Sequence, residues 1–142
     1  MTPYPVLAAA AALLLAWTGA AAAAELEVII QAVEHDRGSI RVSLYHGPEG
    51  FPHEEQALRV RERPAAAGTV TARFGGLGPG RYAVIAYHDE NGDGKMNRFL
   101  GMVPSEGYGL SNNPQVMGPP EFEQAAFGLP AGGGAVEVRL NY

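Results

Sequence analysis

The chain has 142 residues, with no cysteine, ten Lys and Arg, fifteen Asp and Glu, and a formal net charge of −5. A modestly acidic chain without a basic stripe is a poor partner for nucleic acid or for an anionic membrane surface. The lack of cysteine excludes disulfides, thiol catalysis and thiolate metal sites. A hydrophobic core, with or without a bound ion, must therefore hold the fold.

Residues 1–24 consist mostly of Ala, Leu and Val, carry no charged side chain, and end in three alanines before Glu25. An apolar segment followed by small residues predicts a cleaved signal peptide. A retained membrane anchor or a buried helix is the alternative, because the apolar run approaches the roughly 20 residues that a spanning helix needs. We expect residues 25–142 to form one domain, periplasmic or secreted, with no membrane span after cleavage.

From Glu25 onward the apolar residues alternate with period two, which predicts short strands. The expected strands begin at residues 26, 40 and 69, and residues 35–38 are expected to form a hairpin turn between the first two. Residues 57–63 fit a strand better than a short helix. Residues 81–88 carry apolar side chains on both faces, so this strand should be central.

A long irregular loop is predicted over residues 89–121, followed by strands at 122–129 and 135–142. Six or seven short strands predict an all-β fold, a single antiparallel Ig-like sandwich, with a small barrel as the alternative.

The segment that begins at Asp89 is similar to the calcium loop of an EF-hand, with oxygen ligands at alternate positions and Gly at position six. The predicted ligands are Asp89, Asn91, Asp93, the carbonyl of Lys95, and Asn97, and Glu106 would replace the bidentate Glu missing at position twelve. We expect an affinity on the order of 10⁻⁴ to 10⁻³ M. The alternative is a solvent-exposed turn without an ion.

The second candidate site is the segment that begins at Glu106. A long loop in a small domain is often functional, so Tyr108, Ser111 and Asn112, with His88, are predicted to form a partner surface. If the segment folds back on residues 89–97, Ser111 would also supply oxygen to the ion. The alternative is a loop that closes one end of the domain.

Several segments together resemble a known family. These are LGPGRY at 77–82, AYHDENGDGK at 86–95, GMVPSEGYGLSN at 101–112 and PPEFEQA at 119–125. The chain is similar in these segments to the exported bacterial family known as domain of unknown function 2141. The resemblance implies export and a fold, but no reaction. The turn before residue 82 is also similar to those of prealbumin-like and carboxypeptidase-regulatory-like sandwiches.

These patterns favour a non-catalytic binding or structural module of the cell envelope. Its expected partner is an envelope protein or glycan, and it is expected to be a monomer. The competing hypotheses are an envelope enzyme that uses His88 and Glu106 as acid or base, and a purely structural domain. A hydrolase triad of His88, Asp89 and Ser111 lacks the G-x-S-x-G elbow. The four histidines at positions 35, 46, 53 and 88 lack the paired spacing of a zinc motif.

Overall fold

The computed structural model describes residues 23–95, 98–99, 103–104 and 106–142, and these residues form an all-β fold. The elements, in chain order, are β1 (Ala24–Val33), β2 (Ser39–Tyr45), η1 (Glu54–Gln56), β3 (Arg59–Pro64), β4 (Gly68–Leu77), β5 (Gly80–Asp89), β6 (Arg98–Phe99), β7 (Val103–Pro104), β8 (Tyr108–Leu110), α1 (Phe122–Ala125), β9 (Phe127–Leu129) and β10 (Gly134–Arg139). The predicted signal peptide lies outside the described residues except at its end, where β1 begins at Ala24. Among the described residues, no helix has the length and apolarity needed to cross a bilayer.

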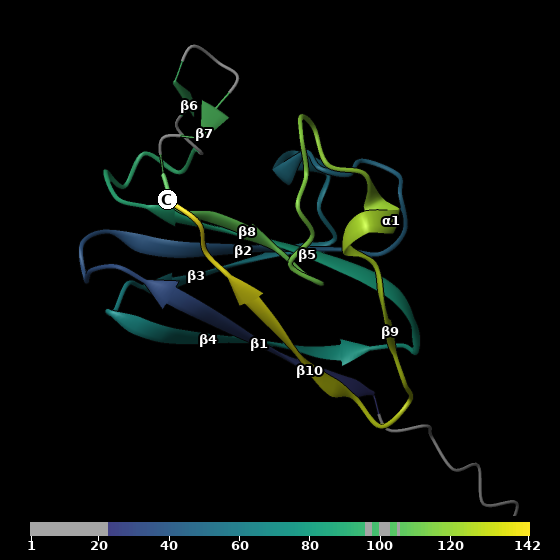
Figure 1. Ribbon diagram of the computed structural model, residues 1–142. Coiled ribbons are helices and arrows are strands. Elements are labelled where there is room, and N and C mark those ends of the chain that lie inside the picture. Colours follow the sequence, from purple (N-terminus) through teal and green to yellow (C-terminus); the bar gives the residue numbers. More distant parts are fainter. Residues whose placement is uncertain (1–22, 96–97, 100–102, 105) are drawn as a thin grey trace, which may run out of the picture.

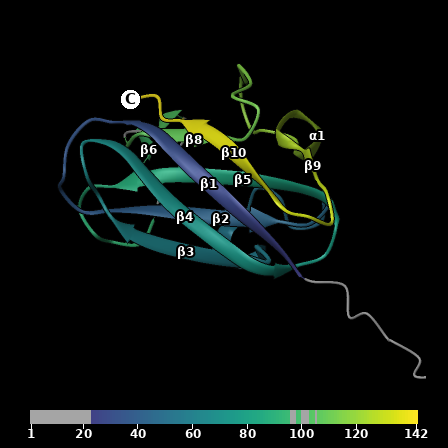
Figure 2. The same ribbon diagram turned by 90° about the horizontal axis from the view of Figure 1, so that it is seen from below.

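The strands form two open sheets that lie over one another (Figures 1 and 2). The first sheet has the order β10-β1-β4, and the second has the order β3-β2-β5-β8, with β9 also paired to β5. The short strands β6 and β7 pair with each other in a separate two-stranded sheet. The two sheets share one core, since their inward side chains belong to a single buried cluster.

Alternating apolar residues build this core, as the period-two pattern predicted. Leu26, Val28 and Ile30 of β1 are fully buried and meet the inward side chains of β2, β4 and β5. The prediction that β5 is central is confirmed, because every residue from Tyr82 to Asp89 is buried. The opposite face of β5 contributes Ala83 and Ile85 to a second cluster beneath α1 and β8.

The topology corrects three predictions. Residues 35–38 do not form a hairpin turn, because β1 and β2 belong to different sheets and the turn crosses between them. The fold is not purely antiparallel, since β1 and β10 pair in parallel, with Leu26 opposite Gly134. In an immunoglobulin constant domain the first two strands share a sheet, so this strand order also differs from the Ig arrangement.

The predicted loop and the strand after it are also more structured than expected. Strand β8 lies inside the predicted loop 89–121, and the predicted strand 122–129 is a helical turn followed by β9. The helix α1 begins after Glu121, whose N–H donates to Gln124 Oε1 at 2.8 Å and whose carbonyl oxygen accepts the N–H of Gln124 at 3.1 Å. Phe122 and Ala125 of α1 are buried against the outer face of β5. The short strands β8 and β9 raise the number of strands in the two sheets above the six or seven expected.

Candidate functional site

The loop after β5 is held by side-chain acceptors at every second residue. Asp89, which is 1% exposed, accepts the backbone N–H of Asp93 at 3.2 Å and of Gly94 at 2.8 Å. Asn91 Oδ1 also accepts the N–H of Asp93, at 3.2 Å, and Asp93 Oδ1 accepts the N–H of Lys95 at 2.8 Å. Gly92 and Gly94 take positive φ angles of 72° and 71°, which glycine adopts without strain. The chain therefore turns tightly around the oxygens of Asp89.

Glu106 lies in the same cluster, although it is distant in sequence. One carboxylate oxygen from each of Asp89, Asp93 and Glu106 lies within 4.8 Å of the others. The pairing of β8 with β5 explains this position, because the N–H of His88 donates to the carbonyl of Gly107 at 2.7 Å. Glu106, the residue before Gly107, therefore lies beside Asp89, the residue after His88, and it is only 5% exposed. The structure thus brings together the three carboxylates that sequence predicted as ligands of one ion.

The cluster brings three carboxyl groups close together. Among the described residues, neither Asp89 nor Asp93 forms an ion pair with Lys or Arg. Buried carboxylates close together repel one another and are costly unless a positive charge or hydrogen bonds compensate them. A divalent cation with oxygen ligands is one such compensation. The cluster offers only oxygen donors, which suits a hard cation.

The remaining predicted ligands differ in their positions. Asn91 lies in the loop, where its Nδ2 donates to Asp93 Oδ2 at 3.3 Å. Lys95 follows Gly94 and is exposed, while Asn97 lies outside the described residues. Ser111 does not supply oxygen to this cluster, because its hydroxyl accepts the N–H of Val84 at 2.9 Å and donates to the carbonyl of Ala125.

The predicted partner surface is corrected in part. His88 and Ser111 are both 0% exposed, so neither can present a surface to a partner. Tyr108 is half-buried in β8 and bridges to Asn141. Asn112 is exposed, but its Nδ2 donates to the carbonyl of Ala126 at 2.7 Å. Ser111 and Asn112 fasten the segment to β5 and to the end of α1, because their side chains bond backbone groups of Val84, Ala125 and Ala126.

The hydrogen-bond partners of His88 bear on the predicted catalytic triad. His88 Nε2 lies 2.6 Å from the carbonyl oxygen of Arg37, and His88 Nδ1 lies 2.8 Å from the hydroxyl of Tyr142. Both ring nitrogens are thus engaged away from Ser111. The residues His88, Asp89 and Ser111 are therefore not assembled as a triad, which requires the base to contact the nucleophile.

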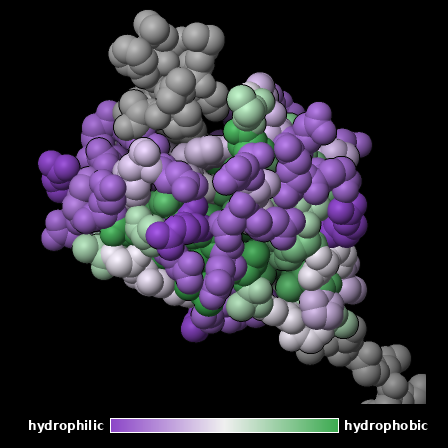
Figure 3. Space-filling model, viewed as in Figure 1, coloured by the Kyte–Doolittle hydropathy of each residue, from purple (hydrophilic) through white to green (hydrophobic). Residues whose placement is uncertain are grey.

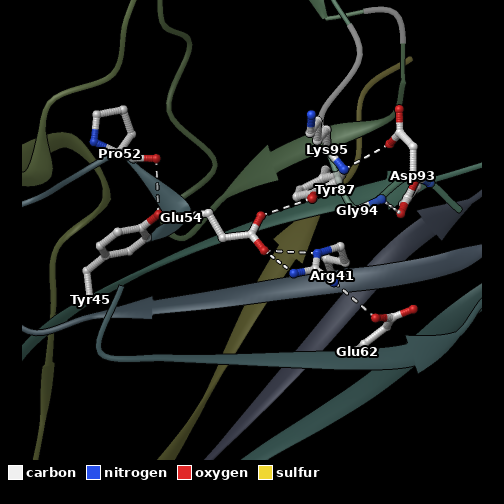
Figure 4. A network of polar contacts seen from close by, with 10 residues as sticks. Arg41, Tyr45, Pro52, Glu54, Glu62, Tyr87, Asp93, Gly94 and Lys95 are labelled. Carbon is white, nitrogen blue, oxygen red and sulfur yellow. Dashed lines mark hydrogen bonds and ion pairs between the residues drawn. The ribbon is translucent and has the colours of Figure 1, made fainter. Parts of the chain in front are cut away.

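A groove beside the loop was missed by sequence reasoning. It has a volume of about 530 Å³ and is lined by Arg41, Glu54, Glu55, Val60, Gly94 and Lys95. Figure 4 shows a polar network that includes Arg41 and Glu54 of this lining, in which Arg41 pairs with Glu54 and Glu62, and Tyr87 donates to Glu54 Oε2 at 2.9 Å. The register that places Arg41 opposite Tyr87 could not be read from alternation alone. Gly94 and Lys95 of the loop therefore form part of the groove lining.

Two buried tyrosines predict a loss of stability in alkali. Burial raises the pKa of Tyr45 well above its usual value of 10.0, and burial followed by the hydrogen bond to Glu54 raises the pKa of Tyr87. Because the raised pKa values belong to the folded state, their contribution is complete below about pH 10 and is lost as the pH rises further. Each tyrosine should lower the free energy of unfolding by up to about 1.4 kcal/mol per pH unit above pH 10.

Urea unfolding at pH 9, 10 and 11 measures this loss. The double variant Tyr45→Phe/Tyr87→Phe should show a much flatter pH dependence above pH 10 than the wild type. An equal slope in both proteins would contradict the assignment to these two residues.

The fold and the loop define an all-β protein with an acidic, oxygen-lined site at the end of its central strand. The chain belongs to the bacterial family described as "Uncharacterized protein conserved in bacteria (DUF2141)", whose model matches residues 28–137. This agrees with the resemblance seen in the sequence segments. A search of curated proteins and a search of solved structures each found no match.

Proposed function

We propose that this protein is an exported, non-catalytic module of the cell envelope that binds calcium at the loop after β5. The observation that carries the proposal is the convergence of Asp89, Asp93 and Glu106, with ligand atoms within 4.8 Å of one another. Two of these carboxylates are buried. A cation bound at this point could take oxygen ligands from all three residues.

The chemistry of the donors favours calcium over softer ions. Calcium takes six to eight oxygen ligands and tolerates irregular geometry, whereas zinc prefers nitrogen and sulfur. In this proposal Asn91, the carbonyl of Lys95, and Asn97 add oxygens to the three carboxylates. The loop already turns around Asp89 through its bonds to Asp93 and Gly94, so little reorganisation is needed.

The ion would act by stiffening one side of the groove. Gly94 and Lys95 belong both to the loop and to the groove lining, so a bound cation would fix the surface that a partner meets. The proposed partner is an envelope protein or a glycan, bound from the periplasm or outside the cell by a monomer. The face in Figure 3 is mostly hydrophilic, with smaller hydrophobic areas between polar residues, which suits a polar partner.

The proposed architecture is a prealbumin-like sandwich. Two features support it. The sheets share one core, and the first two strands of the chain belong to different sheets, with β1 between β4 and β10 and β2 between β3 and β5. Such a scaffold leaves the connections at one end free to carry a binding site.

Calcium titration of the variant Asp93→Asn tests the proposal. Asparagine keeps an oxygen at Oδ1 to accept the N–H of Lys95, so the loop should keep its shape while one negative charge is removed. We expect isothermal titration calorimetry to give a calcium affinity at least about tenfold weaker than that of wild type, or about 1.4 kcal/mol.

Glu137→Gln, an exposed position on β10, is the matched control and should bind as wild type does. Wild-type protein that gives no calcium signal at millimolar concentration would overturn the proposal. So would an unchanged affinity in Asp93→Asn.

A further inference from the structure

A second cluster of metal-ligating side chains lies at the same end of β5. One ligand atom from each of His35, His88 and Glu90 lies within 4.8 Å of the others. Successive side chains of a strand point to opposite faces, so His88 and Asp89 project from opposite faces of β5. This second cluster is therefore separate from the carboxylates of the proposed calcium loop.

The crossing between the two sheets assembles the cluster. Ser39 pairs with Asp89 at the start of β2, so the turn that contains His35 lies against the end of β5. The rings of His35 and His88 are 4.5 Å apart between centroids, and His35 Nε2 lies 2.8 Å from Glu90 Oε1. His35 and Glu90 are partly exposed, whereas His88 is fully buried. An ion could thus approach from solvent toward a fixed inner ligand.

The hydrogen bond on His88 Nε2 determines which nitrogen can bind. The carbonyl oxygen of Arg37 can only accept, so Nε2, at 2.6 Å, carries the proton and Nδ1 carries the lone pair. Metal-binding histidines commonly donate their other N–H to a backbone carbonyl, which fixes the ring orientation. His88 already has this arrangement.

We propose that His35, His88 and Glu90 bind a divalent transition-metal ion of the zinc type, independently of the calcium loop. Two imidazoles and one carboxylate are a ligand set that suits zinc and leaves a position for water or for a group from a partner. The ion takes the place of the proton between His35 Nε2 and Glu90 Oε1, this proton moves to His35 Nδ1, and the ion also binds the lone pair of His88 Nδ1.

Three neighbouring interactions oppose the ion. The backbone N–H of Arg37 donates to His35 Nδ1 at 3.3 Å, and this hydrogen bond must break when Nδ1 takes the ring proton. Arg37 Nη2 lies 3.2 Å from His35 Nε2, and the hydroxyl of Tyr142 lies 2.8 Å from His88 Nδ1. Arg37 is exposed and Tyr142 is 49% exposed, so both side chains can move aside. Since each must be displaced, Arg37→Ala and Tyr142→Phe should both bind the ion more tightly than the wild type. A role for the cluster as a simple ion pair would give no such gain.

Titration with Zn²⁺ in the presence of excess calcium tests the proposal on the full chain. His35→Ala and Glu90→Gln should each weaken zinc affinity at least about tenfold. His53→Ala, at an exposed histidine outside the cluster, should leave it unchanged. Asp93→Asn should also leave zinc affinity unchanged, so that failure of the calcium proposal is distinguishable from failure of this one. Circular dichroism checks that each variant is folded.

Some variants are expected to weaken zinc affinity and others to strengthen it, so the test remains decisive if one variant does not fold. Tighter zinc binding by Arg37→Ala supports the site even without a result from His35→Ala. The proposal is overturned if wild-type protein does not bind zinc at millimolar concentration, or if His35→Ala and Glu90→Gln bind as wild type does. Equal zinc affinity in Arg37→Ala, Tyr142→Phe and wild type overturns it as well.

Discussion

Calcium is expected to raise the melting temperature of the wild-type protein by roughly 10 °C at concentrations about a hundred times its dissociation constant. Binding to the folded state alone adds about 2.7 kcal/mol under that condition, and a domain of this size gains roughly 4 °C for each kcal/mol. Differential scanning calorimetry, with and without calcium, measures the shift.

Asp89→Ala should abolish this shift entirely. Its carboxylate is buried, accepts the N–H groups of Asp93 and Gly94, and belongs to the proposed ligand set. Loss of these acceptors should also lower the stability of the calcium-free protein by about 1 to 3 kcal/mol. Glu137→Gln should retain the full shift. A calcium-dependent rise that survives in Asp89→Ala would show that the ion binds elsewhere.

Gly38→Ala is expected to destabilise the protein by about 3 kcal/mol. Gly38 has a φ of 73°, a region that costs an L-residue about 1 to 2 kcal/mol. A Cβ there would also overlap the carbonyl oxygen of Asp89 and lie 2.9 Å from Glu90 Cα. Relieving that overlap must move backbone rather than a flexible side chain, which adds about 1 to 3 kcal/mol. Urea unfolding gives the free energy difference.

Gly92→Ala is the matched comparison for this effect. Gly92 has nearly the same φ, 72°, but a Cβ there meets nothing within 4 Å. Its substitution should cost only about 1 to 2 kcal/mol of backbone strain. Equal losses in the two variants would mean that the contact between Gly38 and the start of the loop does not constrain the fold.

The alternation of apolar residues predicted most strands, because a half-buried strand needs little more than period two. Strands β1, β2, β4 and β10 follow it, and apolar residues on both faces identified β5 as central. The choice of partner strand could not be predicted in this way. Alternation says which face is inward, but the crossing at residues 35–38 and the parallel β1–β10 pair depend on packing between distant segments.

The same limit applies to the candidate sites. The spacing of Asp89, Asn91 and Asp93 is local, so the loop chemistry was visible in the sequence. Glu106 was predicted as a ligand because the loop lacks the carboxylate of position twelve. The pairing of β8 with β5 places it beside the loop. The proximity of His35 to His88 depends on the register between β2 and β5, and no local spacing encodes that register.

The parallel ladder between β1 and β10 bears on how the protein folds. It joins Leu26 to Gly134 and Gln31 to Arg139, so the middle strand of the first sheet is completed only by the last strand of the chain. Contacts of such high sequence separation give a high contact order, for which folding typically takes milliseconds to seconds. Before that strand docks, β1 has one unpaired edge, and the nascent chain lacks the final closure of its core.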